Sequence, residues 1–143
     1  MSQDVLISPE AARRYDVKTV ARAAAADLVS VLAFAVIGRA SHEDGLTASG
    51  VVEAAWPFLV GVIGGWAGVF IARMAPLSFP AAAMMLVKTV ILGCIIRVVF
   101  TDGDAPLSFV AVATVFLGVC FFGWRFAVRR LSGRADRAST PAS

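Results

Sequence analysis

Four apolar runs, separated by short polar segments, constrain the fold of this chain more than any other feature. The runs extend from about Val20 to Ile37, Ala54 to Ile71, Ala81 to Phe100 and Leu107 to Val128. Each is close to the roughly 20 residues that a helix needs to cross a hydrocarbon core about 30 Å thick. Because only helices and closed barrels satisfy their backbone hydrogen bonds in lipid, the sequence predicts an all-α membrane protein with four transmembrane helices.

The composition agrees with a bilayer environment. Hydrophobic residues make up 59% of the 143 positions, which is too many for a soluble domain of this size, because its surface has to be largely polar. The first run begins at Val20, contains Asp27 and is followed by no clear signal-peptide cleavage site. We therefore expect it to remain in the mature chain as the first span.

A pattern of five residues occurs twice at a constant offset. Each of its members recurs 58 positions later: Arg39, Asp44-Gly45 and Gly65-Trp66 correspond to Arg97, Asp102-Gly103 and Gly123-Trp124. The pattern suggests a tandem duplication of a helical hairpin, over about residues 23–73 and 81–131. The alternative is coincidence, because Gly and Arg are common at helix ends. Under a duplication, the first and third helices are parallel and related by a pseudo-two-fold axis along the membrane normal.

Basic residues are distributed unevenly along the chain. They precede the first run and follow the second and fourth, whereas the two other connections are mainly acidic. The positive-inside rule then predicts that both termini are cytoplasmic. We expect the basic segments to contact anionic membrane lipids, and the lack of an aromatic-interleaved basic surface argues against a nucleic-acid partner.

Little of the chain lies outside the predicted spans. We expect residues 1–19 to form a cytoplasmic tail or an interfacial helix, residues 20–130 the four-helix transmembrane domain, and residues 131–143 a disordered basic tail. Ser8 followed by Pro9 is typical of a helix start in the first segment.

The sequence offers no conventional catalytic centre. Ser41-His42 with nearby carboxylates is the nearest approach to a nucleophile with a base, and a single histidine provides no zinc-type spacing. We therefore expect no enzyme, no catalytic residue, no metal site and no cofactor.

Charged residues within the spans indicate a different kind of site. Asp27 and Lys88 each lie seven residues from the inner end of a predicted helix, about 10 Å deep by helical rise, so they can face each other across the pseudo-two-fold axis. Arg125 and two tryptophans lie near the same depth. Because charges in a span are costly and normally face the bundle interior, the sequence predicts a ligand-binding or ion-binding layer composed of Asp27, Lys88, Arg125, Trp66 and Trp124.

One carboxylate against two cations leaves this layer short of an anion. An anionic ligand, a lipid phosphate or a deprotonated Lys88 would balance it. Alternatively, Asp27 forms a fixed internal pair with one cation, while the other cation extends to the headgroups.

At the opposite ends of the first and third helices, Arg39 and Arg97 are equivalent in the two repeats. With His42, they are candidates for an outer vestibule. The alternative is that each arginine extends to the interface at a helix C-terminus or fixes a loop by a salt bridge.

The second helix is expected to make close helix contacts. Gly61, Gly64, Gly65 and Gly68 form two overlapping small-xxx-small pairs, and the partner helix belongs either to the same chain or to a second protomer. Trp56-Pro57-Phe58 is interpreted as the start of this helix, where a first-turn proline is tolerated.

Several short motifs resemble one known family. They occur in order along residues 23–128: Asp27-Leu28-Val29, Phe34 to Gly38-Arg39, Ser41-His42, Trp56-Pro57-Phe58, Gly65-Trp66, Thr89 to Arg97 and Gly123-Trp124-Arg125. The chain is similar in these motifs to the bacterial and archaeal membrane family called domain of unknown function 3054. The resemblance implies a small four-helix protein of the cytoplasmic (inner) membrane and brings no catalytic residues.

The sequence therefore predicts a small ion, proton-coupled or anionic-solute transporter or channel that uses Asp27, Lys88 and Arg125, in a homo-oligomer or a larger membrane complex. The alternative is a non-catalytic accessory or scaffold subunit that docks through its glycine-rich face.

Overall fold

The computed structural model describes residues 16–41 and 46–138, and these fold into four helices. The helices are α2 (Val17–Ala40), α3 (Ala48–Ile71), α4 (Phe79–Phe100) and α5 (Leu107–Ala138). All four are long and apolar enough to cross a membrane, and no strand occurs among the described residues. The predicted all-α, four-span architecture is confirmed, whereas the short helix expected after Ser8 lies outside the described residues.

Capping side chains fix where the helices begin. Asp16, Thr47 and Ser78 each accept a hydrogen bond from a backbone N–H three residues later, at 3.2 Å in all three cases, as N-cap residues do. Because Thr47 caps α3, this helix begins at Ala48 rather than near Ala54. The interpretation of Pro57 as a first-turn proline is therefore wrong, since it lies inside α3. Its missing N–H removes the hydrogen bond to the Glu53 carbonyl, four residues earlier.

The last helix is longer than predicted. α5 continues to Ala138, so the prediction that the chain loses regular structure from residue 131 onward is wrong for residues 131–138. Residues 139–143 lie outside the described part. The helix continues because no proline or glycine-based stop follows the apolar run until Gly133, and a single glycine lowers helix stability without ending a helix.

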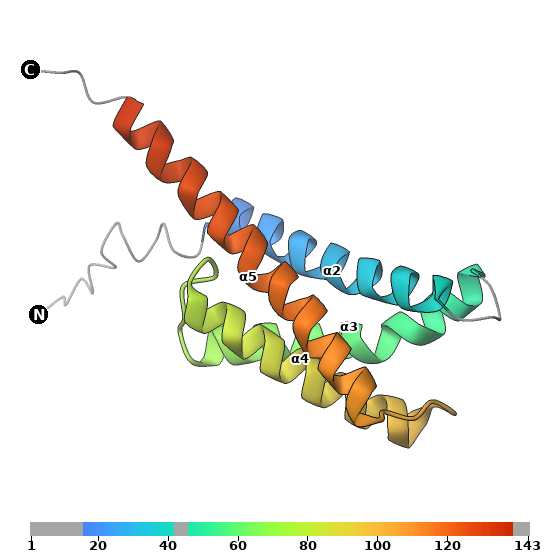
Figure 1. Ribbon diagram of the computed structural model, residues 1–143. Helices are drawn as coiled ribbons and strands as arrows, with labels where there is room; N and C mark the ends of the chain where they lie inside the picture. Colours follow the sequence, from blue (N-terminus) through green and yellow to red (C-terminus); the bar gives the residue numbers. More distant parts are fainter. Residues whose placement is uncertain (1–15, 42–45, 139–143) are drawn as a thin grey trace, which may run out of the picture.

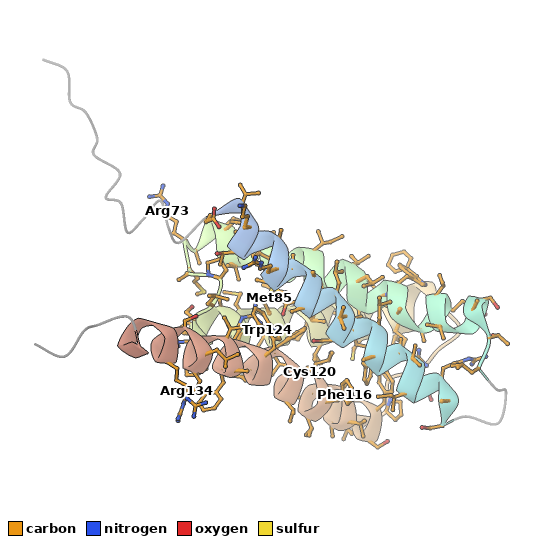
Figure 2. The ribbon with its side chains drawn as sticks, turned by 90° about the horizontal axis from the view of Figure 1, so that it is seen from above. Arg73, Met85, Phe116, Cys120, Trp124 and Arg134 are labelled. Atoms are coloured by element: carbon orange, nitrogen blue, oxygen red, sulfur yellow. The ribbon has the colours of Figure 1, made fainter. Side chains whose placement is uncertain are left out.

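The helices form a four-membered ring in which sequence neighbours contact each other and α5 closes the ring against α2 (Figure 1). The start of α2, the α3–α4 connection and the end of α5 lie at one end, which we call the basic end (Figures 1 and 2). The α2–α3 and α4–α5 connections lie at the other end, which we call the cavity end. The exposed cations of the basic end are Lys18, Arg22, Arg73, Arg129, Arg130 and Arg134.

The glycines of α3 pack against α4 of the same chain. A Cβ atom added to Gly61 would lie 2.6 Å from the backbone oxygen of Thr89 and 2.8 Å from its Cα, and one added to Gly65 would lie 2.8 Å from Met85 Sδ. Only glycine permits so close an approach of two helices. The open question of the partner helix is thus answered within one chain, and the glycine-rich face is not available as a docking surface.

A Schellman motif ends α3 at the basic end. The N–H of Arg73 donates to the Phe70 carbonyl at 3.1 Å, and the N–H of Met74 donates to the Val69 carbonyl at 2.9 Å, which is the pattern of this motif. Arg73 has a φ of 52°, a left-handed conformation that normally favours glycine. The motif turns the chain sharply into the α3–α4 connection.

Four phenylalanines from three helices fill the core toward the cavity end. Phe34 lies at the centre, with ring centroids 5.3 Å from Phe58, 6.0 Å from Phe109 and 5.7 Å from Phe116. Phe58 and Phe109 are also in contact at 6.0 Å. These separations are those of favourable aromatic pairs, so the phenylalanine cluster forms a dense layer across the bundle.

Candidate functional site

A buried ion pair joins the first and last helices. Arg125 Nη1 lies 2.9 Å from Asp27 Oδ1, and Arg125 Nη2 lies 3.0 Å from Asp27 Oδ2. Both side chains have 0% exposure. The two parallel bonds are the fork geometry that makes an arginine–carboxylate pair strong and directional. Asp27 and Arg125 therefore neutralise each other inside the bundle.

The remaining donors of Arg125 fix it to the backbone. Its Nε donates to the carbonyl oxygen of Pro76 at 2.9 Å, and its Nη1 also donates to the carbonyl oxygen of Phe121 at 3.1 Å. Pro76 is buried in the α3–α4 connection. One guanidinium thus ties together α2, α5 and the connection that covers the basic end.

Two tryptophans border the same carboxylate. Trp124 Nε1 donates to Asp27 Oδ1 at 3.0 Å, and the ring of Trp124 lies 4.3 Å from Arg125 Cζ. Trp66 is buried and interacts with the same carboxylate, although its Nε1 has no partner at direct hydrogen-bond geometry among the described residues. We call Asp27, Arg125, Trp66 and Trp124 the Asp27 cluster.

Local helix periodicity explains why the two charges face inward. Asp27 lies between Ala23 and Val31 at four-residue spacing, and Arg125 continues the buried stripe of Leu117 and Phe121 at the same spacing. Side chains four residues apart lie on one face of a helix. Each charge therefore occupies a core position that its helix turns toward the bundle axis.

The prediction that Lys88 faces Asp27 is wrong. Lys88 is exposed, whereas the next residue, Thr89, is buried. Successive helical residues are turned by about 100°, so Lys88 points away from the interior. Equal depth in the membrane does not bring two side chains together unless their helix faces also match. With Lys88 outside, the predicted excess of cations in the layer disappears.

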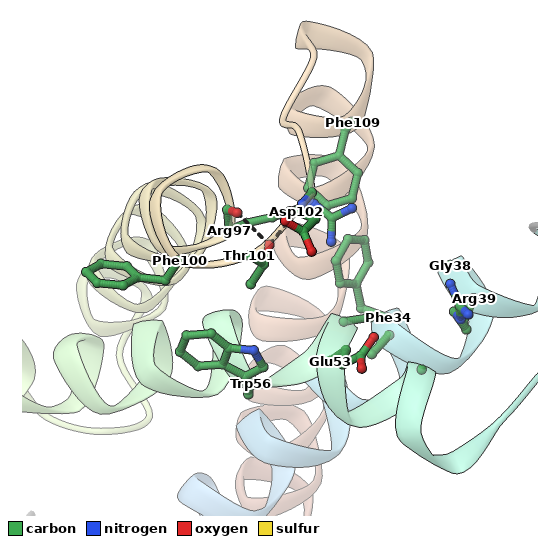
Figure 3. A pocket seen from close by; sticks show the side chains of 14 residues that line it. Phe34, Gly38, Arg39, Glu53, Trp56, Arg97, Phe100, Thr101, Asp102 and Phe109 are labelled. Atoms are coloured by element: carbon green, nitrogen blue, oxygen red, sulfur yellow. Dashed lines mark hydrogen bonds between the residues drawn. The ribbon is translucent and has the colours of Figure 1, made fainter.

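A cavity of about 710 Å³ opens at the cavity end (Figure 3). All four helices contribute to its wall. Arg39 and Arg97, expected in an outer vestibule, both line it, whereas His42 lies outside the described residues. Its other lining residues are Phe34, Ala35, Gly38, Gly50, Glu53, Ala54, Trp56, Phe100, Thr101, Asp102, Gly103 and Phe109.

Each cavity arginine lies against a glycine. A Cβ added to Gly50 would lie 2.9 Å from Arg39 Cζ, and one added to Gly103 would lie 2.8 Å from Arg97 Cζ. Arg97 is also fixed by its Nε, which donates to the Asp104 carbonyl at 2.8 Å, and by the ring of Phe109, 4.8 Å from its Cζ. Because the two glycines lack a Cβ, the planar guanidinium groups fit against the backbone at these positions.

The repeat-equivalent residues take matching places. Arg39 and Arg97 line one cavity, and Trp66 and Trp124 flank one carboxylate, as a duplicated hairpin predicts. The ion pair itself breaks the symmetry: 58 positions after Asp27 stands Met85, which is buried.

The interior between the two sites contains a further unpaired polar group. Thr89 Oγ1 is buried and has no hydrogen-bond partner among the described residues, although a helical threonine ordinarily bonds the carbonyl one turn earlier. An unmade hydrogen bond in the core costs about 1 to 3 kcal/mol. Thr89 Oγ1 is therefore a polar atom in the core whose hydrogen-bonding capacity is not used by the described residues.

Sequence reasoning did not identify all of these partners. The carbonyls of Pro76 and Phe121 carry no side-chain signal and could not have been found from residue types. The sequence places Trp56 at the start of the second helix and gives it no role in a site, because it places the start of α3 too late. The spacing of Thr89 from Met85 and Gly93 would have located the buried face of α4 and excluded Lys88.

Comparison with protein families matches residues 24–128 to the family described as Protein of unknown function (DUF3054). No curated protein and no solved structure matches the chain. The matched residues include the whole Asp27 cluster and both cavity arginines. Because the match covers most of its length, the chain belongs to the DUF3054 family.

Proposed function

We propose that this chain is a small-solute transporter, described here in the conformation that is open at the cavity end and shut at the basic end. The observation that carries the proposal is the contrast between the two ends. At one end, residues of all four helices line a cavity with charged and aromatic walls. At the other, a neutral ion pair closes the bundle beneath the α3–α4 connection. Secondary transporters commonly place their sites at the interface of two repeats.

In this proposal, the Asp27 cluster acts as a gate. Closing it satisfies both charges, and opening it requires the bonds of Arg125 to Asp27 and Pro76 to break together. The solute then passes Thr89 Oγ1, whose unused hydrogen-bonding capacity is a cost that a purely structural core would avoid. The phenylalanine cluster separates the cavity from this gate and has to move in the same step.

We further propose that the basic end faces the cytoplasm and that the membrane is the cytoplasmic one. The segregation of exposed cations at this end is what the positive-inside rule associates with a cytoplasmic surface. The cavity then opens to the outside.

Accessibility of one buried position tests the transport proposal. Ser30 lies one turn from Asp27 toward the cavity end and is buried. Cys94 and Cys120 are free thiols and are first replaced by alanine. In sealed proteoliposomes, Ser30→Cys should react with a membrane-impermeant maleimide applied from either side, and Arg125→Gln should accelerate labelling from the basic end. Complete protection from both sides, with and without Arg125→Gln, would show that the interior is a static core.

The second candidate function is an accessory subunit. Lys88 is exposed among Val87 and Ile91 on the outer face of α4, and a charge on a lipid-facing surface is costly. An acidic residue of a partner helix, in a second copy or in a larger complex, would offset it. Under this alternative, a partner co-purifies in mild detergent and is lost with Lys88→Met. Under the transporter proposal, Lys88 extends toward the headgroups at the basic end, and Lys88→Met changes nothing.

A further inference from the structure

The lining of the cavity has a chemistry that specifies a ligand class. Arg39 and Arg97 are half-buried, whereas the two carboxylates of the lining, Glu53 and Asp102, are exposed. Charges that are partly removed from water interact more strongly than exposed ones, which solvent and salt screen. The cationic side chains therefore belong to the deeper part of the wall, and the carboxylates belong to its rim.

The charge of Arg97 is directed into this cavity without a carboxylate partner in the described part of the chain. Its hydrogen bond to the Asp104 carbonyl uses Nε, and the face of its guanidinium lies on Phe109. These two contacts leave Nη1 and Nη2, the two nitrogens that would form a fork toward a ligand carboxylate. Gly103 permits this orientation, because a Cβ at this position would overlap the guanidinium.

Aromatic rings from all four helices complete the wall. Phe34 from α2, Trp56 from α3, Phe100 from α4 and Phe109 from α5 line the cavity. Figure 3 shows the rings of Phe34 and Phe109 beside Arg97, whereas the ring of Phe100 projects away from it. Apolar and aromatic walls with a few placed polar groups are typical of sites for small organic molecules, whose volumes range over about 300 to 1,000 Å³. A bare inorganic anion would leave this surface unused.

We propose that the cavity binds a small organic carboxylate with a flat, apolar body. Its carboxylate lies against the guanidinium group of Arg97, and its body contacts the aromatic rings. The inference rests on the proposed function, because it names the class of solute that the transporter would take. The exposed carboxylates at the rim repel a ligand that carries a second negative charge on its outer side.

Binding to the full-length protein in nanodiscs tests the inference without any transport step. The probes are phenylacetate, acetate, which lacks the apolar body, and 2-phenylethylamine, which keeps the body and reverses the charge. By equilibrium dialysis, phenylacetate should bind with a Kd at least roughly tenfold below that of acetate, because an apolar ring buried in a pocket is typically worth a factor of that order. The amine should show no saturable binding.

Two matched pairs of variants locate the site. Arg97→Gln should weaken phenylacetate binding by roughly tenfold or more, whereas Arg129→Gln, at the basic end, should leave the Kd unchanged. Gly103→Ala should weaken binding by displacing the Arg97 guanidinium, whereas Gly123→Ala, which meets no atom within 4 Å, should not. If Arg97→Gln fails to fold, the glycine pair still decides the question. Equal binding of acetate or of the amine, or unchanged binding in Gly103→Ala, would overturn the inference.

The outcome separates this inference from the proposed function. If the protein binds phenylacetate but its Ser30→Cys variant is never labelled from the basic end, the binding site is supported and the transport role is refuted. If Ser30→Cys is labelled from both ends but phenylacetate does not bind, the transport role is supported and the proposed ligand class is refuted.

Discussion

Asp27 and Arg125, which are 98 positions apart in the sequence, form a two-bonded ion pair with no solvent exposure of either side chain. Desolvating two charges is costly, and a buried pair is retained only where its geometry and additional hydrogen bonds offset that cost. Here the bonds to Pro76 and Trp124 supply the additional partners. The pair therefore couples the closure of the bundle to the position of the α3–α4 connection.

The first prediction concerns the stability of this pair. Removing one partner leaves the other charge buried without a counter-charge, so Asp27→Ala should lower the free energy of unfolding by about 3 to 5 kcal/mol. Combining Asp27→Leu with Arg125→Met should recover most of the loss, because two apolar side chains leave no buried charge. Unfolding in a detergent titration measures all variants, with Lys88→Ala as the exposed control. A double variant as unstable as Asp27→Ala would contradict the pairing.

The second prediction concerns the close approach of α3 and α4. Gly61→Ala places a methyl group against the Thr89 backbone, so it should destabilise the protein by about 1 to 3 kcal/mol, as overpacking does. Gly123→Ala, which meets open space, should be neutral or stabilise by up to about 1 kcal/mol through helix propensity. Thermal unfolding of the two variants provides the comparison. Equal effects would show that the helices are less closely packed than described.

The third prediction uses the left-handed residue that ends α3. Because Arg73 has a φ of 52°, Arg73→Gly should be about 1 kcal/mol more stable than Arg73→Ala, since a Cβ in this conformation costs roughly 1 to 2 kcal/mol. Both substitutions remove the same charge, so the difference isolates the backbone. Chemical denaturation of the two variants measures it, and identical stabilities would argue against the Schellman motif.

The sequence predicted the four spans because each depends only on a long apolar run, which no tertiary contact is needed to recognise. It also predicted that Asp27 is paired inside the bundle, since a charge in lipid has few alternatives. The prediction that Lys88 faces Asp27 failed, because it compared the depths of the two residues in the membrane and did not compare the faces of their helices. The sequence also placed the start of α3 too late, because the amphipathic turn from Ala48 to Glu53 lacks an apolar run and is defined by the Thr47 cap.

The cavity could not be predicted from residue types alone. Arg39 and Arg97 were recognised as equivalents, but their convergence on one space depends on the packing of all four helices. Trp56 and Glu53 join them only because α3 begins before these residues. The matching positions of the two arginines support the duplication more directly than the five sequence identities do.

The fourth prediction concerns orientation. Because exposed cations gather at the basic end, reporter fusions before residue 1 and after residue 143 should both report the cytoplasm. A fusion inserted in the α4–α5 connection at Asp104 should report the outside. Opposite locations for the two termini would be incompatible with four spans.

The most direct test of the gate is a distance measurement between α2 and α5 at the basic end. Spin labels at Lys18→Cys and Arg130→Cys, with Cys94 and Cys120 replaced by alanine, report this separation in proteoliposomes by pulsed electron paramagnetic resonance. The gate predicts two distance populations, and Arg125→Gln should shift the distribution toward the longer one, because the ion pair stabilises only the closed arrangement. A single distance that Arg125→Gln leaves unchanged would contradict a moving gate and identify Asp27 and Arg125 as a purely structural pair.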